Sequence, residues 1–398
     1  MKNLTNLYRI SINDIYQREP PNMADQKINW KNTLFLIITP LIGIGGTLIL
    51  ASLGLIPWQT WALSGIYLAA TGIAITAGYH RLMAHPSYVA AKAVKVVLTL
   101  LATGSYEGSA LEWCTDHRNH HRYADTDRDP YNINKGFWFA HIGWLIRLDT
   151  STRDYSNVPD LTADPFLRFQ HRYFGILAAV MGFVVPMAIA GLWGDFLGGL
   201  IVAGALRITI NHHFTFFINS LCHCVGKQVY TDKQTARDNW ITALVTYGEG
   251  FHNFHHQFPI DFRNGIRYFH FDPTKWLIYG LSLVGLANNL KRVSDHKILQ
   301  YRLRLDEKRL LACYDKKPSY VEQTVVPLKQ KILSVMQRIE ELEKGLVTLK
   351  ASKMEHFYDK LSVYQTTLKE HGFNLRNAQA ELDAFLYKWK TITAQAAQ

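Results

Sequence analysis

Four long apolar stretches limit most strongly what this chain can fold into. They cover residues 33–53, 58–77, 173–193 and 196–217, and Arg207 is the only Lys or Arg within them. A helix needs about 20 consecutive apolar residues to cross the hydrocarbon core of a bilayer. Short links at 54–57 and at Gly194 join the stretches into two hairpins. The sequence therefore predicts an all-α integral membrane protein with four transmembrane helices.

The charged residues predict how this protein is oriented in the membrane. The formal net charge is +11, and Lys and Arg are concentrated before residue 33, between 78 and 172, and after 217. Cytoplasmic loops carry such an excess, so we expect both termini and the long loops on the cytoplasmic side. The charged N-terminal segment does not resemble a signal peptide, which predicts an uncleaved first span. We interpret the excess charge as affinity for the membrane surface and not for nucleic acid, with an acidic partner or an anionic substrate as the alternative.

Four short motifs gather nine of the 17 histidines beside or between these spans. The nine are His80, His85, His117, His120, His121, His223, His252, His255 and His256. Residues at i, i+3 and i+4 share one face of a helix, so the triplets at 117–121 and 252–256 can each bind metal from one side. The five-residue spacing of His80 and His85 does not align on a regular helix, and Pro86 follows. This pair is therefore predicted to straddle the end of the helix that continues the second span.

The number of imidazoles indicates two metal ions. Imidazole suits Fe, Zn, Cu and Ni, whereas structural zinc takes four ligands and usually includes cysteine. Two irons with four or five nitrogen ligands each, and open positions for O2, match the count. The other histidines considered are interpreted as ordinary polar side chains: His141, His171, His212, His213, His270 and His296. Asp116 and Glu249 flank the motifs and either orient ligating imidazoles or are ordinary surface charges.

The chain divides into three predicted parts. Residues 1–32 form an N-terminal cytosolic segment, 33–296 carry the spans and the histidines, and 297–398 form a charged helical extension. Within the extension, apolar residues recur in steps of three and four, which is a heptad pattern. They are Leu328, Ile332, Val335, Ile339, Leu342, Leu346 and Leu349. We expect Gly372 to turn the chain into a last helix, and we expect helices packed within one chain in preference to an intermolecular coiled coil.

At this level of detail the chain resembles a known family. The order H-x4-H, H-x2-HH, N-S-x2-H, H-x2-HH is similar to that of the membrane-bound fatty acyl desaturases, specifically the acyl-CoA Δ9 (stearoyl-CoA type) branch. The longer runs at 76–85, 112–121, 136–144 and 248–259 also resemble that branch, and the likeness covers roughly residues 34–292. The resemblance makes 33–296 a fatty acid desaturase domain, here of a bacterial-like form without a fused cytochrome, and predicts a bacterial inner-membrane location.

The resemblance also implies a fold and a mechanism. Four membrane helices would lie under a cytosolic helical cap that holds a di-iron centre of two Fe2+ ions. All nine clustered histidines would be iron ligands, Asn219 would contact one iron through water, and no catalytic residue would be separate from these ligands. O2 would then be used to introduce a cis double bond, at Δ9, into a saturated acyl chain held in a closed apolar tunnel. The tunnel walls would include Trp113, Trp138 and Trp144.

Two departures from the family pattern concern the partners. A basic pair that helps bind CoA is replaced here by Leu148 and Asp149, so Arg147 and Arg153 become the candidates for binding the head group. An acyl-CoA substrate is expected, with an acyl lipid or an acyl-carrier thioester as the alternative. The C-terminal part lacks the His-Pro-Gly-Gly motif of a fused cytochrome, so a separate electron-donor protein is expected. The helical extension would either dock that donor or be purely structural.

Two other functions remain open from the sequence. A hydroxylase or another mono-oxygenase can use the same histidine scaffold. A metal-binding membrane protein without catalysis, such as a transporter, is the non-enzymatic alternative. Transport predicts ionisable residues along a path through the membrane, and the four spans are almost free of them.

Overall fold

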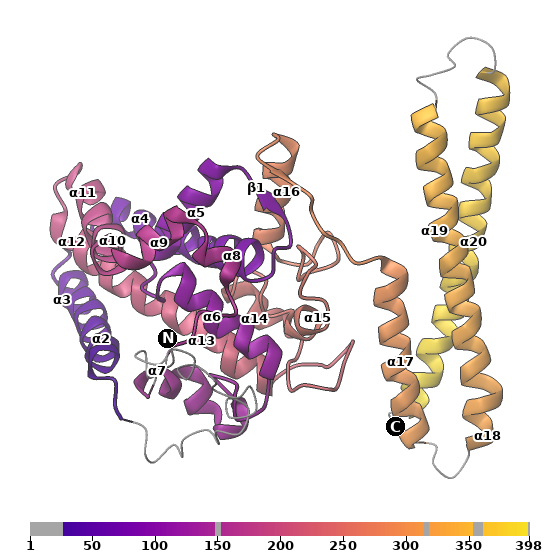
Figure 1. Ribbon diagram of the computed structural model, residues 1–398, viewed down its shortest axis with the longest axis horizontal. Coiled ribbons are helices and arrows are strands. Elements are labelled where there is room, and N and C mark those ends of the chain that lie inside the picture. The colour runs from indigo at the N-terminus through magenta and orange to yellow at the C-terminus, as the bar shows by residue number, and fades with distance from the viewer. Residues whose placement is uncertain (1–26, 148–152, 314–317, 353–360, 397–398) are drawn as a thin grey trace, which may run out of the picture. The chain divides into compact units, whose positions relative to one another are not determined.

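The computed structural model describes residues 27–147, 153–313, 318–352 and 361–396, and these are mostly helical (Figure 1). Contacts within the chain define two units, which are described separately. The first unit comprises residues 1–227 and 234–291, and the second comprises 228–233 and 292–398.

Four helices of the first unit are long and apolar enough to cross a membrane, which confirms the four predicted spans. They are Trp30–Ser52, Trp58–Ala84, Phe174–Gly191 and Phe196–Cys224. The second and fourth helices continue beyond the apolar stretches that end at residues 77 and 217. Their polar ends therefore carry His80, Asn219 and His223 out of the predicted membrane region.

Each span combines α-helix with a wider π-helical segment. The first contains α2 (Trp30–Pro40), η2 (Leu41–Gly45) and α3 (Gly46–Ser52), and the second contains α4 (Trp58–Ala74) and η3 (Ile75–Ala84). The third contains α10 (Phe174–Ala179), η6 (Val180–Val184) and α11 (Val185–Gly191), and the fourth contains α12 (Phe196–Leu200), η7 (Ile201–Leu206) and α13 (Arg207–Cys224). π-helical segments are often found at functional sites, and η3 carries the first histidine motif.

Glycines allow the spans to pack closely. A Cβ atom at Gly43 would lie 2.6 Å from the backbone nitrogen of Leu206, where the first span crosses the fourth. A Cβ atom at Gly199 would lie 2.6 Å from the Cβ atom of Ala190 within the second hairpin. Small residues are typical of such interfaces because membrane helices associate mainly by close packing.

Shorter elements complete the first unit. They are α5 (Lys92–Thr103), α6 (Ala110–Tyr123), η4 (Ile133–Lys135), η5 (Phe139–Gly143), α7 (Trp144–Ile146), α8 (Pro159–Thr162), α9 (Pro165–Arg172), α14 (Trp240–Val245), α15 (His252–Gln257) and α16 (Pro273–Leu283). Strands β1 (Val89–Ala90) and β2 (Ala287–Asn288) form one antiparallel pair.

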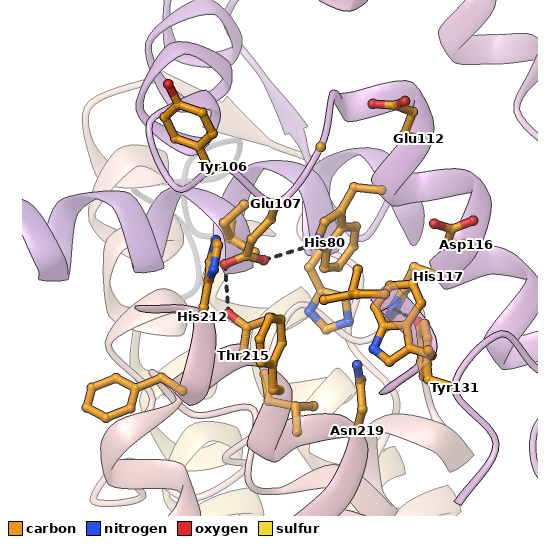
Figure 2. A pocket seen from close by; sticks show the side chains of 18 of the residues that line it. His80, Tyr106, Glu107, Glu112, Asp116, His117, Tyr131, His212, Thr215 and Asn219 are labelled. Atoms are coloured by element: carbon orange, nitrogen blue, oxygen red, sulfur yellow. Dashed lines mark hydrogen bonds between the residues drawn. The ribbon is translucent and has the colours of Figure 1, made fainter. Parts of the chain in front are cut away.

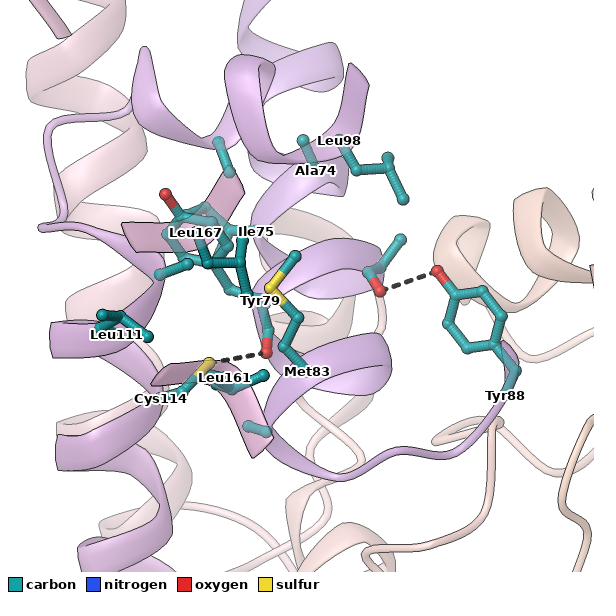
Figure 3. Close-up of a cluster of buried hydrophobic side chains, with 14 of the residues drawn as sticks. Ala74, Ile75, Tyr79, Met83, Tyr88, Leu98, Leu111, Cys114, Leu161 and Leu167 are labelled. Atoms are coloured by element: carbon teal, nitrogen blue, oxygen red, sulfur yellow. Dashed lines mark hydrogen bonds between the residues drawn. The ribbon is translucent and has the colours of Figure 1, made fainter. Parts of the chain in front are cut away.

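The core of the first unit surrounds the end of the second span. Tyr79 and Met83 from η3 lie among side chains of α5, α6, α8 and α9, as Figure 3 shows. The hydroxyl of Tyr88 donates to the carbonyl of Ala77 at 2.9 Å, and the thiol of Cys114 donates to the carbonyl of Tyr79 at 3.4 Å. This packing fixes the segment from which His80 and His85 project.

The second unit contains a long antiparallel helical hairpin. Its elements are α17 (Asp295–Cys313), α18 (Pro318–Tyr320), η8 (Val321–Val325), α19 (Val326–Ser352) and α20 (Leu361–Ala396), and α19 and α20 lie side by side (Figure 1). Leu328, Ile332, Val335 and Ile339 of the predicted heptad pattern are buried between the helices. The prediction of a turn at Gly372 is wrong, because α20 runs through this residue. Glycine destabilises a helix by about 1 kcal/mol relative to alanine, and the packing of α20 against α19 offsets this cost.

Replacing Ile332 with alanine should destabilise the second unit. The side chain is completely buried, in a cluster that includes Trp389. A buried Ile→Ala change costs about 2–5 kcal/mol, so hydrogen exchange in α19 and α20 should accelerate in the full-length protein. The exposed neighbour Ser334 provides the control, since Ser334→Ala should leave exchange unchanged. Equal exchange rates in the two variants would contradict this packing.

Candidate metal centre

Nine histidines converge in two groups at one end of the spans. The first group consists of His80, His85, His117, His121 and His255, and the second of His120, His223, His252 and His256. Within each group the ligand nitrogens lie within 4.8 Å of one another. These nine are the histidines singled out from the sequence, so the structure brings all four motifs together. None of the six histidines interpreted as ordinary side chains belongs to either group.

A π-helix explains how His80 and His85 join one group. Residues five apart point about 140° away from each other on an α-helix. Here the N–H of His85 donates to the carbonyl of His80 at 3.0 Å, the i→i+5 bond of a π-helix. The wider turn brings both imidazoles to one side, and their ring centroids are 4.9 Å apart.

Helices α6 and α15 each supply both groups. On α6, His117 and His121 enter the first group while His120 enters the second. On α15, His255 enters the first group while His252 and His256 enter the second. The i, i+3, i+4 spacing thus puts three histidines on one face of each helix, and that face contributes ligands to both groups. Helix α6 is fixed at its start by a capping box between Ser109 and Glu112, which satisfies two backbone N–H groups.

Hydrogen bonds from the outer ring nitrogens define the tautomer of two imidazoles. Nδ1 of His120 lies 2.9 Å from the carboxylate of Asp129, and Nδ1 of His256 lies 2.9 Å from the side-chain carbonyl oxygen of Gln234. An oxygen acceptor there requires Nδ1 to donate, so a neutral ring carries its lone pair on Nε2. The Nε2 atoms of these two rings face each other at 3.2 Å. Two lone pairs cannot hydrogen-bond to each other.

Other pairs of imidazoles in the two groups also face each other through their Nε2 atoms at about 3 Å. Nε2–Nε2 distances are 2.8 Å for His85 and His117, 3.0 Å for His80 and His255, and 2.9 Å for His121 and His255. In the second group, His252 lies 3.1 Å from His223 and 3.0 Å from His256. A metal holds imidazole nitrogens at about 2.1 Å, so two ligands at right angles would lie about 3.0 Å apart. The residues present therefore fit two bound metal ions.

Burial keeps these imidazoles neutral, the form that binds metal. Desolvation, reinforced by neighbouring histidines or arginines, lowers the pKa of six group members outside the spans. These are His85, His117, His121, His252, His255 and His256.

Glu249 orients His80 in the first group. Its carboxylate accepts from Nδ1 of His80 at 3.0 Å and from the guanidinium of Arg81 at 2.9 Å. Burial alone would raise the pKa of Glu249, but His80 and Arg81 outweigh this effect and the pKa is lowered. Arg81 is held in turn by Asp272 at 3.0 Å, whose carboxylate also accepts the N–H groups of Asn264, Gly265 and Lys275. Sequence reasoning had singled out Glu249 but missed Arg81 and Asp272.

The second group has its own supporting residues, which sequence reasoning missed. Asp129 accepts from His120, and the hydroxyl of Thr235 lies 2.7 Å from Nδ1 of His223. The Asp125 carboxylate accepts both the hydroxyl and the N–H of Thr235. Asp125 and Asp129, from the loop after α6, thus support histidines of the second group. Their position directly after the 117–121 motif is the one signal in the sequence that pointed to them.

Asp116, the other flanking carboxylate, has a different partner from the one expected. It accepts from Arg153 at 2.7 Å, and Arg153 also pairs with Glu112 at 3.1 Å. Burial, opposed by Arg153, raises the pKa of Asp116 to about 6. Arg153, a head-group candidate, is therefore engaged by two carboxylates in the wall of a cavity. Arg147 lies at the end of α7, and residues 148–152 are outside the described part of the chain.

A cavity of about 530 Å³ adjoins both histidine groups. His80, His117, His120 and His252 line it, and Figure 2 shows the amide of Asn219 pointing towards this side of the cavity. Much of the remaining wall is apolar: Phe35, Leu36, Ile75, Phe174, Phe214, Phe216 and Ile218. The size is typical of small-molecule sites. Trp113 and Trp144 line the cavity as expected, but Trp138 does not, and its side chain is 72% exposed.

Glu107 lies in the wall of this cavity. Its carboxylate accepts from Thr215 at 2.9 Å, as Figure 2 shows. It also accepts from Trp113 at 3.3 Å and from Asn211 at 2.8 Å. Burial raises the pKa of Glu107 to about 7, although these three hydrogen bonds oppose the shift. The carboxylate thus joins the turn before α6 to the fourth span.

Fold and site define a helical multi-pass membrane protein with a two-part histidine centre beside an apolar cavity. Residues 56–282 match the family model described as fatty acid desaturase. The chain is 46% identical over 288 residues to the probable acyl-CoA desaturase of Schizosaccharomyces pombe and 43% identical over 293 residues to acyl-CoA desaturase 1 of Saccharomyces cerevisiae. It is 36% identical over 284 residues to stearoyl-CoA desaturase 5 of Bos taurus. The chain therefore belongs to the fatty acid desaturase family.

The extent of these matches differs. They cover 71%, 73% and 69% of this chain in the order given, and 59%, 57% and 82% of the three relatives. The chain thus spans less than three fifths of the two yeast proteins. All three relatives are eukaryotic and the first two are fungal, so the comparisons do not support the expected bacterial-like form or a bacterial inner-membrane location.

Replacing Glu249 with alanine should weaken metal binding at the first group. The change leaves Nδ1 of His80 without its acceptor, and loss of such a partner typically costs about 10–100-fold in metal affinity. Metal per chain, measured after dialysis against a chelator series, should fall for Glu249→Ala and less for Glu249→Gln. Glu322 is exposed in the second unit, and Glu322→Ala should retain metal as the wild type does. Equal retention in Glu249→Ala and Glu322→Ala would exclude this role.

The metal-free protein should lose stability in mild acid. The folded-state pKa values of the buried histidines lie below the unfolded value of about 6.5, as their burial requires. As pH falls below 6.5 the unfolded chain therefore binds more protons than the folded chain, and stability decreases. The melting temperature of chelator-treated protein in detergent should be lower at pH 5 than at pH 7.5. A melting temperature that is equal or higher at pH 5 would contradict this titration.

Proposed function

We propose that this chain is an acyl-CoA desaturase of the stearoyl-CoA type, which introduces a cis double bond at the Δ9 position of a saturated acyl chain. The observation that carries the proposal is the position of both histidine groups on the wall of an otherwise largely apolar cavity. The names of the two yeast relatives and the bovine relative support an acyl-CoA substrate. A saturated chain offers no polar handle, so the cavity must select the target carbons by position alone.

The nine histidines are proposed as ligands of two Fe2+ ions, with Asn219 contacting one through water. Bound iron would supply the O2 chemistry that removes hydrogen from two adjacent carbons and releases water. The protein's own contribution is to hold the imidazoles through Glu249, Asp129, Thr235 and Gln234. Burial of these groups also excludes bulk water from the site, which strengthens every electrostatic interaction there.

Polar residues in the cavity wall are proposed to receive the head group. They are Asn29, Lys31, Asn32, Glu112 and Arg153. Arg153 is held by Glu112 and Asp116, so it would act from a fixed position. Arg147, at the end of α7, is the second candidate for contact with the head group.

Electrons are proposed to come from a separate donor protein, with both termini and the histidine centre on the cytoplasmic side of the membrane. The excess of Lys and Arg in the long polar segments supports this orientation. A cytosolic cap built from α6, α15 and the loops around them, and a helical extension after residue 296, belong to the same proposal.

Product analysis tests the activity. We expect the full chain, expressed in a host that lacks its own desaturase, to produce unsaturated fatty acids detectable by gas chromatography with mass spectrometry. Labelled saturated acids of several lengths would locate the double bond. Hydroxy acids without new unsaturation would support the mono-oxygenase alternative instead. The absence of both products would support the alternative of a metal-binding membrane protein without catalysis.

Single histidine replacements should separate ligands from other histidines. His120→Ala and His255→Ala each remove one member of a group and should abolish desaturation while membrane insertion is unchanged. His141, which hydrogen-bonds to Ser220 and His213, lies outside both groups, so His141→Ala should retain at least part of the activity. Unsaturated product and membrane-bound protein are measured together for each variant. Full activity in His120→Ala or His255→Ala would remove that residue from the ligand set.

A further inference from the structure

Arg207 is a fully buried arginine within the fourth span. Its guanidinium donates to the carbonyl of Gly104 at 2.8 Å, to the carbonyl of Gly182 at 3.0 Å and to that of Ala203 at 3.1 Å. It also packs over the ring of Tyr67, 4.9 Å from its centroid. An ionisable residue at this depth is costly and usually has a function.

The partners of Arg207 come from separate parts of the chain. Gly182 lies in the middle of the third span, and Gly104 directly follows α5. The end of α5 is buried, with Ala102 and Thr103 fully covered. The turn after α5 therefore lies at the level of the middle of the spans. Non-helical backbone at that depth must have its polar groups satisfied by protein.

Side chains on the fourth span hydrogen-bond to several residues of the turn after α5. Arg207, Asn211 and Thr215 are spaced i, i+4 and i+8, and they bind the Gly104 carbonyl and the Glu107 carboxylate. The ring of His212 hydrogen-bonds to the carbonyl of Ser105 at 2.8 Å. Asn219, four residues after Thr215, continues the same row towards the histidine groups. One helix, α13, therefore positions both the turn and part of the metal centre.

The turn is itself strained and forms part of the cavity wall. Tyr106 has a φ of 59°, which is uncommon for a bulky residue. Its ring packs against Gly182, where an added Cβ atom would lie 2.6 Å away. Tyr106, Glu107 and Gly108 line the cavity, and Figure 2 shows Tyr106 and Glu107 on the same segment. A strained segment persists only when its surroundings hold it firmly.

We propose that Arg207 is a specificity-determining positioning residue, which holds the turn 104–108 against the third and fourth spans and thereby sets where a substrate chain lies relative to the histidine groups. This inference rests on the proposed desaturase function. Arg207 touches neither the cavity nor the histidines, so it acts through the turn. Arg207→Met removes every hydrogen bond of the guanidinium, whereas Arg207→Lys keeps a charge that can still donate to carbonyls.

The test compares products and backbone exchange in full-length protein. Arg207→Met should lower kcat/KM for the preferred chain length by about tenfold or more, because small misplacements of a reacting chain are costly. It should also spread the double bond over further positions or chain lengths, and Arg207→Lys should restore part of the wild-type pattern. Arg168 provides a matched control, since it also donates to two carbonyls, of Thr162 and Ala163, but is exposed. Arg168→Met should keep the wild-type pattern.

Metal content and hydrogen exchange complete the experiment. We expect unchanged metal per chain and faster exchange over residues 103–109 in Arg207→Met. A wild-type product pattern with wild-type exchange in Arg207→Met would overturn the inference. If Arg207→Met fails to accumulate, the product pattern and the hydrogen exchange of Arg207→Lys test the inference. We expect smaller changes in both, and a wild-type product pattern with wild-type exchange would contradict the inference. Absence of any unsaturated product from the wild type would contradict the proposed function, and the exchange comparison would still test the role of Arg207.

Discussion

Unprotonated imidazole nitrogens that face each other at about hydrogen-bond distance are the constraint on which the rest of the structure depends. The Nδ1–H groups of His120 and His256 each donate a hydrogen bond to an oxygen, and the Nε2 atoms of the two rings lie 3.2 Å apart. Such an arrangement is repulsive until a cation lies between the rings, so metal binding and folding are coupled. The acceptors at Asp129, Gln234 and Glu249 therefore hold the centre together as much as the histidines do.

The membrane helices serve this centre by extending beyond the bilayer-length part of the chain. The second span ends in a π-helical segment that carries His80, and the fourth continues through Asn219 to His223. Polar side chains along the fourth span also hold the buried turn after α5, which lines the cavity. One continuous helix thus relates the apolar cavity to the histidines, as the proposed selection of carbons along a featureless hydrocarbon chain requires.

The spans and the nine clustered histidines followed from spacing, because apolar length and helical periodicity are local properties. The hydrogen-bond partners did not follow. Asp272 supports Arg81 from 191 residues away, and Thr235 reaches His223 from a loop without periodicity. Gly372 shows the opposite failure, where a strong local signal for a turn is overridden by packing along α20. Trp138 resembled its neighbours in sequence, and only its position on the surface excluded it from the cavity wall.

By itself, the sequence determined that this is a helical membrane protein with enough clustered imidazoles for two metal ions, and it carried the motifs of the fatty acid desaturase family. The tertiary structure decided which histidine joins which group, which carboxylates orient them, and that three backbone carbonyls hold the buried guanidinium of Arg207. The reason is physical: composition and periodicity act within one helix, whereas protonation, hydrogen-bond partners and cavity walls depend on residues that only folding brings together.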